Sequence, residues 1–219
     1  MVVLSAADLR FFAEHGWVVA KGVIGAAQCA KAAQEVWDFA QLSASDEESW
    51  YEDDGETLRP VALGEGGWYH GEAEWENRTD PRVHEAFSEL WGTETLWTSH
   101  DGGGLNLPVR EPALKNSDRE ELHWDCDLRL WSLAEAKAAR PIVGGVQGVL
   151  YLVDTPPENG AFVCLPGFHR QLDSWLDTLS EGTDNLCAAM NDEFQGDYLR
   201  VGVFFIYRCV WDHFVSIFV

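Results

Sequence analysis

Hydrophobic side chains recur every three to four positions in two stretches near the start of the chain, 5–16 and 26–42. In 5–16 an apolar stripe lies between Ser5, a favourable helix N-cap, and Gly16, a favourable helix end, which predicts a first helix. A similar stripe predicts a second helix over 26–42. Between them, residues 17–20 read Trp-Val-Val-Ala, a composition typical of a short strand.

Residues 43–78 follow neither the helical nor the strand pattern. The segment is acidic, most densely over 46–54, and it contains several glycines together with Trp50, Trp68 and Trp75. A solvated linker seldom carries so many large aromatic rings. We therefore predict an irregular loop that packs on the body of the protein through these three tryptophans.

After residue 79 one helix gives way to short β-like runs separated by turns. Asp80 followed by Pro81 predicts a helix start, and Gly92 predicts its end. Strands are expected over 95–100, 105–107, 121–126, 144–153, 161–165, 198–207 and 209–219, with a turn at 156–160 and a helix over 170–179. This order predicts a mainly β fold with flanking helices, an antiparallel sandwich or jelly roll, in one domain spanning residues 1–219.

The charge of the chain disfavours several kinds of partner. The 219 residues contain 37 Asp and Glu against 15 Lys and Arg, a formal net charge of −22. Such a chain repels phosphate groups, so we expect neither nucleic acid nor a membrane as a partner. No apolar run is long enough to cross a bilayer and no secretory leader is visible, which predicts an intracellular, cytoplasmic protein. Five cysteines without C-x-x-C spacing argue against a disulfide framework and a structural zinc site.

His123 and Asp125 have the spacing of a metal-binding pair within the predicted strand 121–126. Residues two apart on a strand point to the same face, so an imidazole and a carboxylate converge there. They would supply two of the three ligands of the 2-His-1-carboxylate arrangement found in Fe(II) oxygenases. The third ligand has to come from another strand.

Three blocks of sequence resemble the phytanoyl-CoA dioxygenase family of Fe(II)/2-oxoglutarate-dependent oxygenases. They read LSAADLRFFAEHGWVVAKGVI, LHWDCDL and VQGVLYLVDTPPENGAFVCLPGFHR, and they occur in the order of the family. The resemblance implies a double-stranded β-helix, which is a jelly roll. It also implies Fe(II), 2-oxoglutarate and O₂ as cofactor and cosubstrates, and the hydroxylation of a small organic molecule.

The resemblance also suggests the third iron ligand. In the family the histidine of the P-G-S-H turn, here His169, is generally not a ligand. The distal ligand comes from a later strand with the pattern G-D, a hydrophobic run, then H-G. Residues 202–213 can be laid on that pattern with His213 at the ligand position. Two departures weaken the match, since Val203 replaces the usual Asp and Phe214 replaces the usual Gly. We predict His123, Asp125 and His213 as the ligand set.

A further departure concerns the cosubstrate. The family places an Arg about a strand beyond the distal histidine, where it binds 2-oxoglutarate, but no Arg or Lys follows His213. We therefore expect a missing last strand, an exposed apolar edge over 211–219, and weak 2-oxoglutarate binding with slow turnover, as in a fragment or a divergent member. Arg129 and Arg208 are the alternative cations.

The sequence also offers candidate cosubstrate contacts and two alternative functions. Gln147, Asn106 and Trp97 are candidates for contact with the cosubstrate, although each residue type is more often part of the packing. One alternative function is a catalytically inactive, dioxygenase-like binding protein, as the missing Arg suggests. Another is a carbohydrate-binding jelly roll, suggested by the 11 tryptophans.

Overall fold

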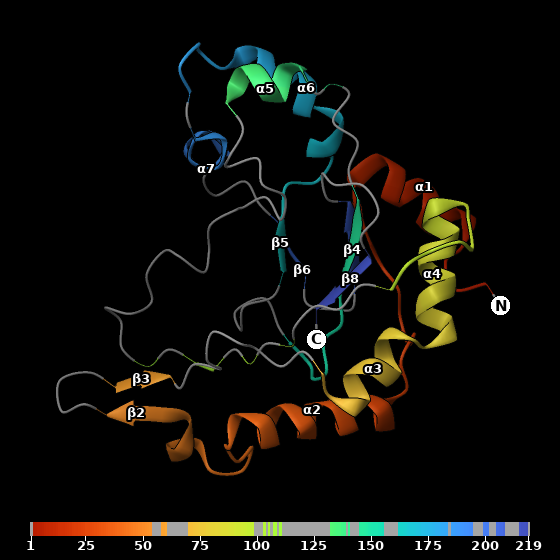
Figure 1. Ribbon diagram of the computed structural model, residues 1–219, viewed down its shortest axis with the longest axis vertical. Coiled ribbons are helices and arrows are strands. Elements are labelled where there is room, and N and C mark those ends of the chain that lie inside the picture. The colour runs from red at the N-terminus through yellow and green to blue at the C-terminus, as the bar shows by residue number, and fades with distance from the viewer. Residues whose placement is uncertain are drawn as a thin grey trace.

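The architecture is taken from a computed structural model of the chain. It describes residues 2–53, 58–60, 70–98, 103, 105, 107, 108, 110, 132–138, 140, 145–155, 162–183, 185–194, 199–201, 205–208 and 215–218. The helices are α1 (Ala6–His15), α2 (Ala26–Ala40), α3 (Glu72–Arg78), α4 (Pro81–Trp91), α5 (Leu133–Ala138), α6 (Leu172–Thr178) and α7 (Leu186–Phe194), with short 3-10 turns η1 (Glu47–Trp50) and η5 (Phe168–Arg170). The strands are β1 (Trp17–Val19), β2 (Tyr51–Asp53), β3 (Leu58–Pro60), β4 (Val146–Val149), β5 (Phe162–Cys164), β6 (Leu199–Val201), β7 (Phe205–Arg208) and β8 (Val215–Phe218) (Figure 1).

The ends of α1 and α4 confirm the helix boundaries expected from the sequence. Ser5 caps α1 in a reciprocal capping box with Asp8, and Gly16 closes the helix in the left-handed conformation. Asp80 caps α4 by accepting a hydrogen bond from the backbone N–H of Arg82. These boundaries can be predicted from the sequence because each depends on side chains within a few residues of the helix end.

The predicted irregular loop over 43–78 is in part wrong, because it contains regular elements. β2 and β3 pair as an antiparallel hairpin, and α3 forms near the end of the segment. The N-terminus of α3 is stabilised from another helix: the Glu35 carboxylate on α2 accepts hydrogen bonds from the Ala73 backbone N–H at 3.0 Å. A cap supplied 38 positions away leaves no local sequence signal.

The aromatic rings of this segment differ in how far they pack. Trp50 is half-buried and stacks on Trp37 of α2 with ring centroids 5.4 Å apart, as predicted. Trp75 on α3 keeps 38% of its surface exposed, with the Arg78 guanidinium 4.7 Å from its ring centroid. Trp68 lies outside the described residues.

Other predicted elements agree less closely with the structure. Residues 95–98 form no strand beyond a single bridging residue, Thr98. The predicted strand over 144–153 shortens to β4. The described residues of the predicted strand over 198–207 all lie in β6 or β7. The predicted strand over 121–126 and the turn at 156–160 lie outside the described residues.

Four strands form the main sheet in the order β1-β7-β4-β8. β7 pairs antiparallel with both β1 and β4, as expected, but β8 runs parallel to β4. β4 lies between β7 and β8 and pairs antiparallel with the first and parallel with the second. The sheet is therefore mixed. β5 and β6 form a second, antiparallel pair.

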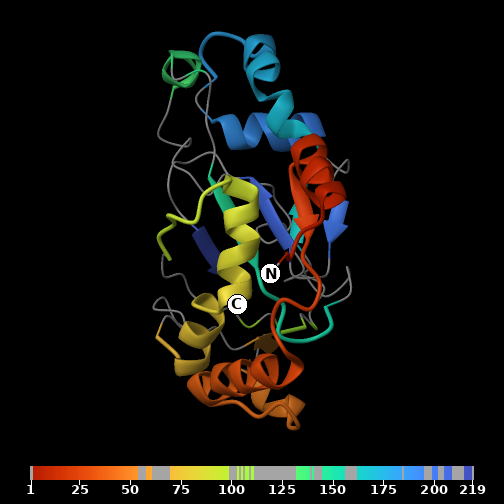
Figure 2. The same ribbon diagram turned by 90° about the vertical axis from the view of Figure 1, so that its right-hand side faces the viewer.

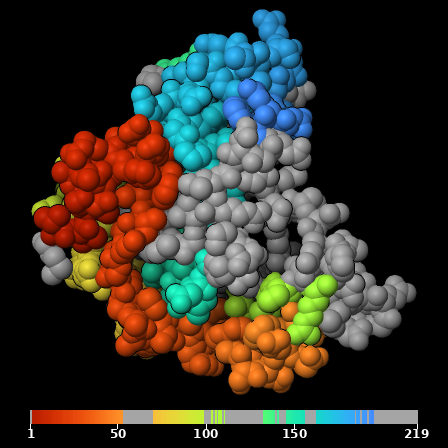
Figure 3. All heavy atoms as spheres, turned by 180° about the vertical axis from the view of Figure 1, so that it is seen from behind, coloured from red at the N-terminus to blue at the C-terminus, as the bar shows by residue number. Residues whose placement is uncertain are grey.

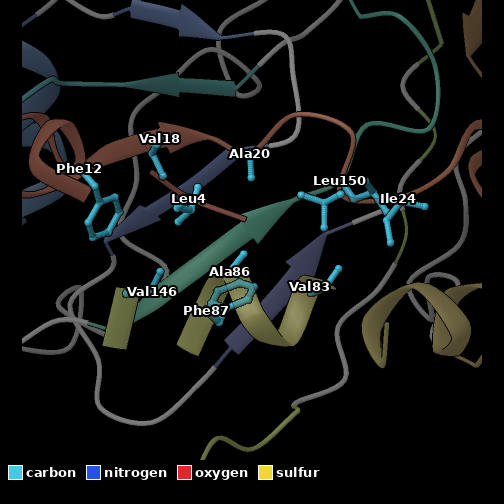
Figure 4. Packing of buried hydrophobic residues seen from close by; sticks show 11 residues of the cluster. Leu4, Phe12, Val18, Ala20, Ile24, Val83, Ala86, Phe87, Val146 and Leu150 are labelled. Carbon is cyan, nitrogen blue, oxygen red and sulfur yellow. The ribbon is translucent and has the colours of Figure 1, made fainter. Parts of the chain in front are cut away.

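The main hydrophobic core lies between the four-stranded sheet and the helices α1 and α4. Val146 from β4 and Val18 from β1 pack there with Phe12 of α1 and Phe87 of α4 (Figure 4). Figure 2 shows α4 lying across one face of this sheet. These four side chains are at most 9% exposed, so the helices cover that face of the sheet.

A second core joins α5, α6 and α7 beside the β5–β6 pair. Its centre is the buried side chain of Trp175 on α6, with Leu172, Leu176 and Leu186 around it. Val163 of β5 is partly buried and packs against this cluster. Each of the two sheets therefore carries helices on one face. We call the opposite face of each sheet its inner face.

Candidate active site

The face of β4 that turns away from the main core carries Gln147. Val146 and Leu150 belong to the main core, and side chains alternate along a strand. Gln147, Val149 and Tyr151 therefore point to the opposite face. Gln147 is only 7% exposed, and it lies in the middle of the sheet, where it pairs with Tyr207 on β7 and Ser216 on β8. A buried polar side chain at the centre of a sheet marks this face as a candidate site.

The corresponding face of β5 carries Phe162 and Cys164. Val163 and Leu165 pack on the second core, so alternation turns the two neighbouring side chains away from the helices. Burial raises the pKa of the Cys164 thiol to about 12. A thiol with that pKa is protonated at neutral pH, so the Cys164 side chain is uncharged on this face.

Tyr151 connects these two faces. Its hydroxyl oxygen accepts a hydrogen bond from the Phe162 backbone N–H at 2.5 Å. Burial raises the pKa of the Tyr151 hydroxyl, while this bond acts in the opposite direction. The contact joins the segment that follows β4 to the start of β5. Gln147 and Cys164 belong to the two segments that this hydrogen bond joins.

The turn that follows β5 docks on the C-terminal end of α1. The Gly167 backbone N–H donates to the His15 carbonyl at 2.7 Å, and His169 Nε2 lies 3.1 Å from the Ala13 carbonyl oxygen. A carbonyl only accepts, so Nε2 of His169 carries the proton in this contact. Figure 3 shows α1 in red against the cyan segment that carries this turn. The contact gives His169 a structural role on α1.

The remaining predicted residues fall into two groups. His123, Asp125, His213, Asn106 and Arg129 lie outside the described residues, and so does any contact between them. Trp97 is 83% exposed, and Arg208 is the last residue of β7. Within the described part of the chain, no group of three or more His, Cys, Asp or Glu side chains is arranged to hold a metal ion.

Tyr151 and Cys164 are residues of the inner faces that the sequence analysis did not select. The signal that could have found Tyr151 is its spacing, because Gln147, Val149 and Tyr151 occupy alternate positions of one run. Cys164 gives a weaker signal, since a cysteine in an apolar strand usually contributes only packing. No helix in the described ranges has the length and apolar character needed to cross a membrane.

Comparison with known proteins assigns the family. The family model for phytanoyl-CoA dioxygenase (PhyH) matches residues 12–193, which include His123, Asp125 and the strands β4 and β5. The matched family is one of dioxygenase-like oxidoreductases. The chain belongs to the phytanoyl-CoA dioxygenase family. His213 lies beyond the matched residues.

Two curated proteins are similar to parts of the chain. The chain is 24% identical over 189 residues to a Dictyostelium discoideum protein named "Putative phytanoyl-CoA dioxygenase", covering 73% of this chain and 54% of that protein. It is 33% identical over 116 residues to "Ava biosynthesis cluster protein O" of Aspergillus versicolor, covering 49% and 32%. The chain thus spans about half or less of the length of these relatives. No solved structure matches the chain.

Proposed function

We propose that the chain is a non-haem Fe(II)- and 2-oxoglutarate-dependent oxygenase that hydroxylates a small organic molecule. The observation that carries this proposal is the family match over 12–193, which contains the His-x-Asp sequence at 123–125. The family generally depends on Fe(II) and 2-oxoglutarate. A jelly-roll core is part of the proposal, and the two helix-backed sheets that meet at Tyr151 are consistent with it.

The proposed donors fit the metal by their chemistry. Two imidazoles and one carboxylate, from His123, His213 and Asp125, form the donor set that non-haem Fe(II) takes in oxygenases. Each imidazole would bind through a neutral ring nitrogen and Asp125 through its ionised carboxylate. When bound, iron supplies the redox chemistry by which O₂ and 2-oxoglutarate oxidise the substrate.

The described residues contribute to the proposed site through its walls. Gln147 offers both a hydrogen-bond donor and an acceptor from a buried position, which suits the orientation of a polar cosubstrate or substrate group. Cys164 remains protonated, so it would not compete with the imidazoles as a thiolate ligand. Tyr151 holds the start of β5 next to the β4 segment and so sets the separation of the walls.

Iron binding by ligand variants tests the assignment. Iron content and Fe(II) affinity would be measured under anaerobic conditions for the unmodified chain and for His123→Ala, Asp125→Ala and His213→Ala. Loss of a supporting residue typically weakens metal affinity about 10–100-fold, so we expect loss of a direct ligand to exceed about 100-fold. Two exposed residues, His70 and Asp154, serve as controls when changed to Ala.

His169→Ala separates the two candidate third ligands. We expect this variant to keep its iron and to lose thermal stability, because His169 contacts the Ala13 carbonyl of α1. Iron loss in His169→Ala with full retention in His213→Ala would reverse the ligand assignment. Succinate formation from 2-oxoglutarate tests the activity separately. Iron binding without succinate would favour the catalytically inactive binding protein.

A further inference from the structure

One face of α3 buries three polar side chains together. Glu74 and Asn77 are 0% exposed and Arg78 is 2% exposed, whereas polar residues of these types are mostly found at the surface. Glu74 and Arg78 form an ion pair one helical turn apart. Asn77 lies on the same face, three positions after Glu74. The face is therefore polar where a short helix would ordinarily bury apolar groups.

Asn77 lies near the middle of the buried arc of α3. At about 100° per residue, it falls between Ala73, which packs on α2, and Glu74. The exposed residues of the helix, Glu72, Trp75 and Glu76, occupy the other side. Lys31 of α2 binds Glu76 at 2.8 Å on that exposed side. The Asn77 side chain thus points into the protein rather than along the exposed contact with α2.

The Asn77 amide is buried among the described residues without a hydrogen-bond partner. Within that part of the chain, neither Nδ2 nor Oδ1 makes a hydrogen bond, although both atoms are buried. Burial of an amide without hydrogen bonds costs roughly 1–3 kcal/mol as judged from protein mutational data. Native proteins pair most buried polar side-chain atoms with protein groups or ordered water. Asn77 therefore points to a further polar group at this position.

We infer that Asn77 holds at least one internal water molecule at this face of α3. The occupant has to accept from Nδ2 and donate to Oδ1, which a single water molecule or a short chain of waters can do. It also has to be small, because Asn77 is fully enclosed. Asn77 itself is neutral, and the adjacent Glu74 and Arg78 form an ion pair with each other, so we take the occupant to be neutral. A polar, enclosed position of this kind is where buried water occurs in globular proteins.

The replacement Asn77→Leu tests this inference by the sign of its effect. The two side chains have the same number and branching of heavy atoms, but leucine cannot bind water. If Asn77 anchors water that also satisfies neighbouring groups, Asn77→Leu leaves those groups unpaired, and the thermal midpoint should fall by about 2–8 °C. If the amide has no occupant, the replacement removes an unfavourable group and the midpoint should rise.

Two further measurements keep the test decisive. Gln34→Leu on an exposed part of α2 gives the effect of placing leucine at a helical surface position, and this effect is subtracted. A high-resolution crystal structure of the unmodified chain should show ordered density within hydrogen-bond distance of Nδ2 or Oδ1. A dry site, or protein groups bonded to both amide atoms, would overturn the inference, as would a rise in the midpoint of Asn77→Leu. The structure decides the question if Asn77→Leu fails to fold.

Discussion

Gly16 shows how a single missing side chain allows two distant segments to meet. Its backbone has φ +79°, and a Cβ added there would lie 2.5 Å from Nδ1 of His169. That separation is shorter than a real Cβ contact allows. Gly16 therefore meets two requirements, a left-handed helix end and a close approach of the His169 ring.

Replacing Gly16 with Ala should destabilise the protein through both requirements. A left-handed backbone costs a non-glycine residue roughly 1–2 kcal/mol, and the clash with the His169 ring adds an overpacking cost of about 1–3 kcal/mol. We expect Gly16→Ala to lower the free energy of unfolding by about 2–5 kcal/mol, as measured by urea denaturation.

Gly22 provides the matched control for this variant. Its φ is +61°, and an added Cβ would meet no atom of the other described residues within 4 Å, its chain neighbours aside. Gly22→Ala should therefore show only the backbone cost, about 1–2 kcal/mol. Equal losses for the two variants would show that the His169 contact is unimportant. If the contact matters, Gly16→Ala combined with His169→Ala should be less destabilised than the two single losses added together.

At the scale of elements, two helices begin with reciprocal capping by a carboxylate. In α1, Asp8 accepts hydrogen bonds from the Ser5 backbone and hydroxyl, and before α5 Glu135 does the same with Ser132. The hydrogen bond from the Ser5 side chain is the main cause that lowers the pKa of Asp8. The backbone bond from Ser132 is the main cause that lowers the pKa of Glu135.

These lowered pKa values make the caps dependent on pH. A carboxyl group whose pKa is lower in the folded state stabilises the protein above its unfolded pKa, and this contribution is lost as pH falls through the folded pKa. Asp8→Asn should therefore lower the thermal midpoint at pH 7, with the difference from the unmodified chain vanishing below about pH 3. Both groups are exposed, so the effect at pH 7 should be small. A difference that persists unchanged at low pH would contradict this account.

Elements with local signals could be predicted from the sequence, and those without could not. The Ser5 and Asp80 caps and the Gly16 and Gly92 helix ends depend on adjacent residues. By contrast, α3 receives its cap from Glu35, and it buries polar side chains that a hydrophobic pattern assigns to the surface. The parallel pairing of β8 depends on which edge of β4 it reaches, which no spacing encodes.

The candidate site could be predicted only in outline. Gln147 was selected as a polar residue in an apolar run, and it is buried on the inner face of β4. Tyr151 was missed because its importance depends on the backbone of Phe162, which belongs to the next strand. The iron ligand set remains a prediction, since His123, Asp125 and His213 lie outside the described residues.

At the scale of the whole molecule, the formal net charge of −22 opposes compaction. Salt screens such repulsion, with a Debye length of about 10 Å at 0.1 M. Raising NaCl from about 0.02 M to about 0.3 M should therefore raise the thermal midpoint by about 2–8 °C, a gain of roughly 1–2 kcal/mol for a chain of this size. Sodium sulfate at equal ionic strength is the comparison. A larger rise in sulfate alone would indicate salt exclusion from the protein surface rather than screening.

The docking of α1 on the turn after β5 has a consequence for synthesis on the ribosome. The His15 carbonyl accepts a hydrogen bond from the Gly167 backbone N–H, and β1 pairs with β7 at residues 205–207. α1 and β1 therefore find these partners only after residues 167 and 205–207 have been translated. Until then the apolar side of α1, including Phe12, has no sheet to cover. We therefore expect the nascent chain to expose hydrophobic surface until these residues emerge, and to bind chaperones that recognise such surface on emerging polypeptides.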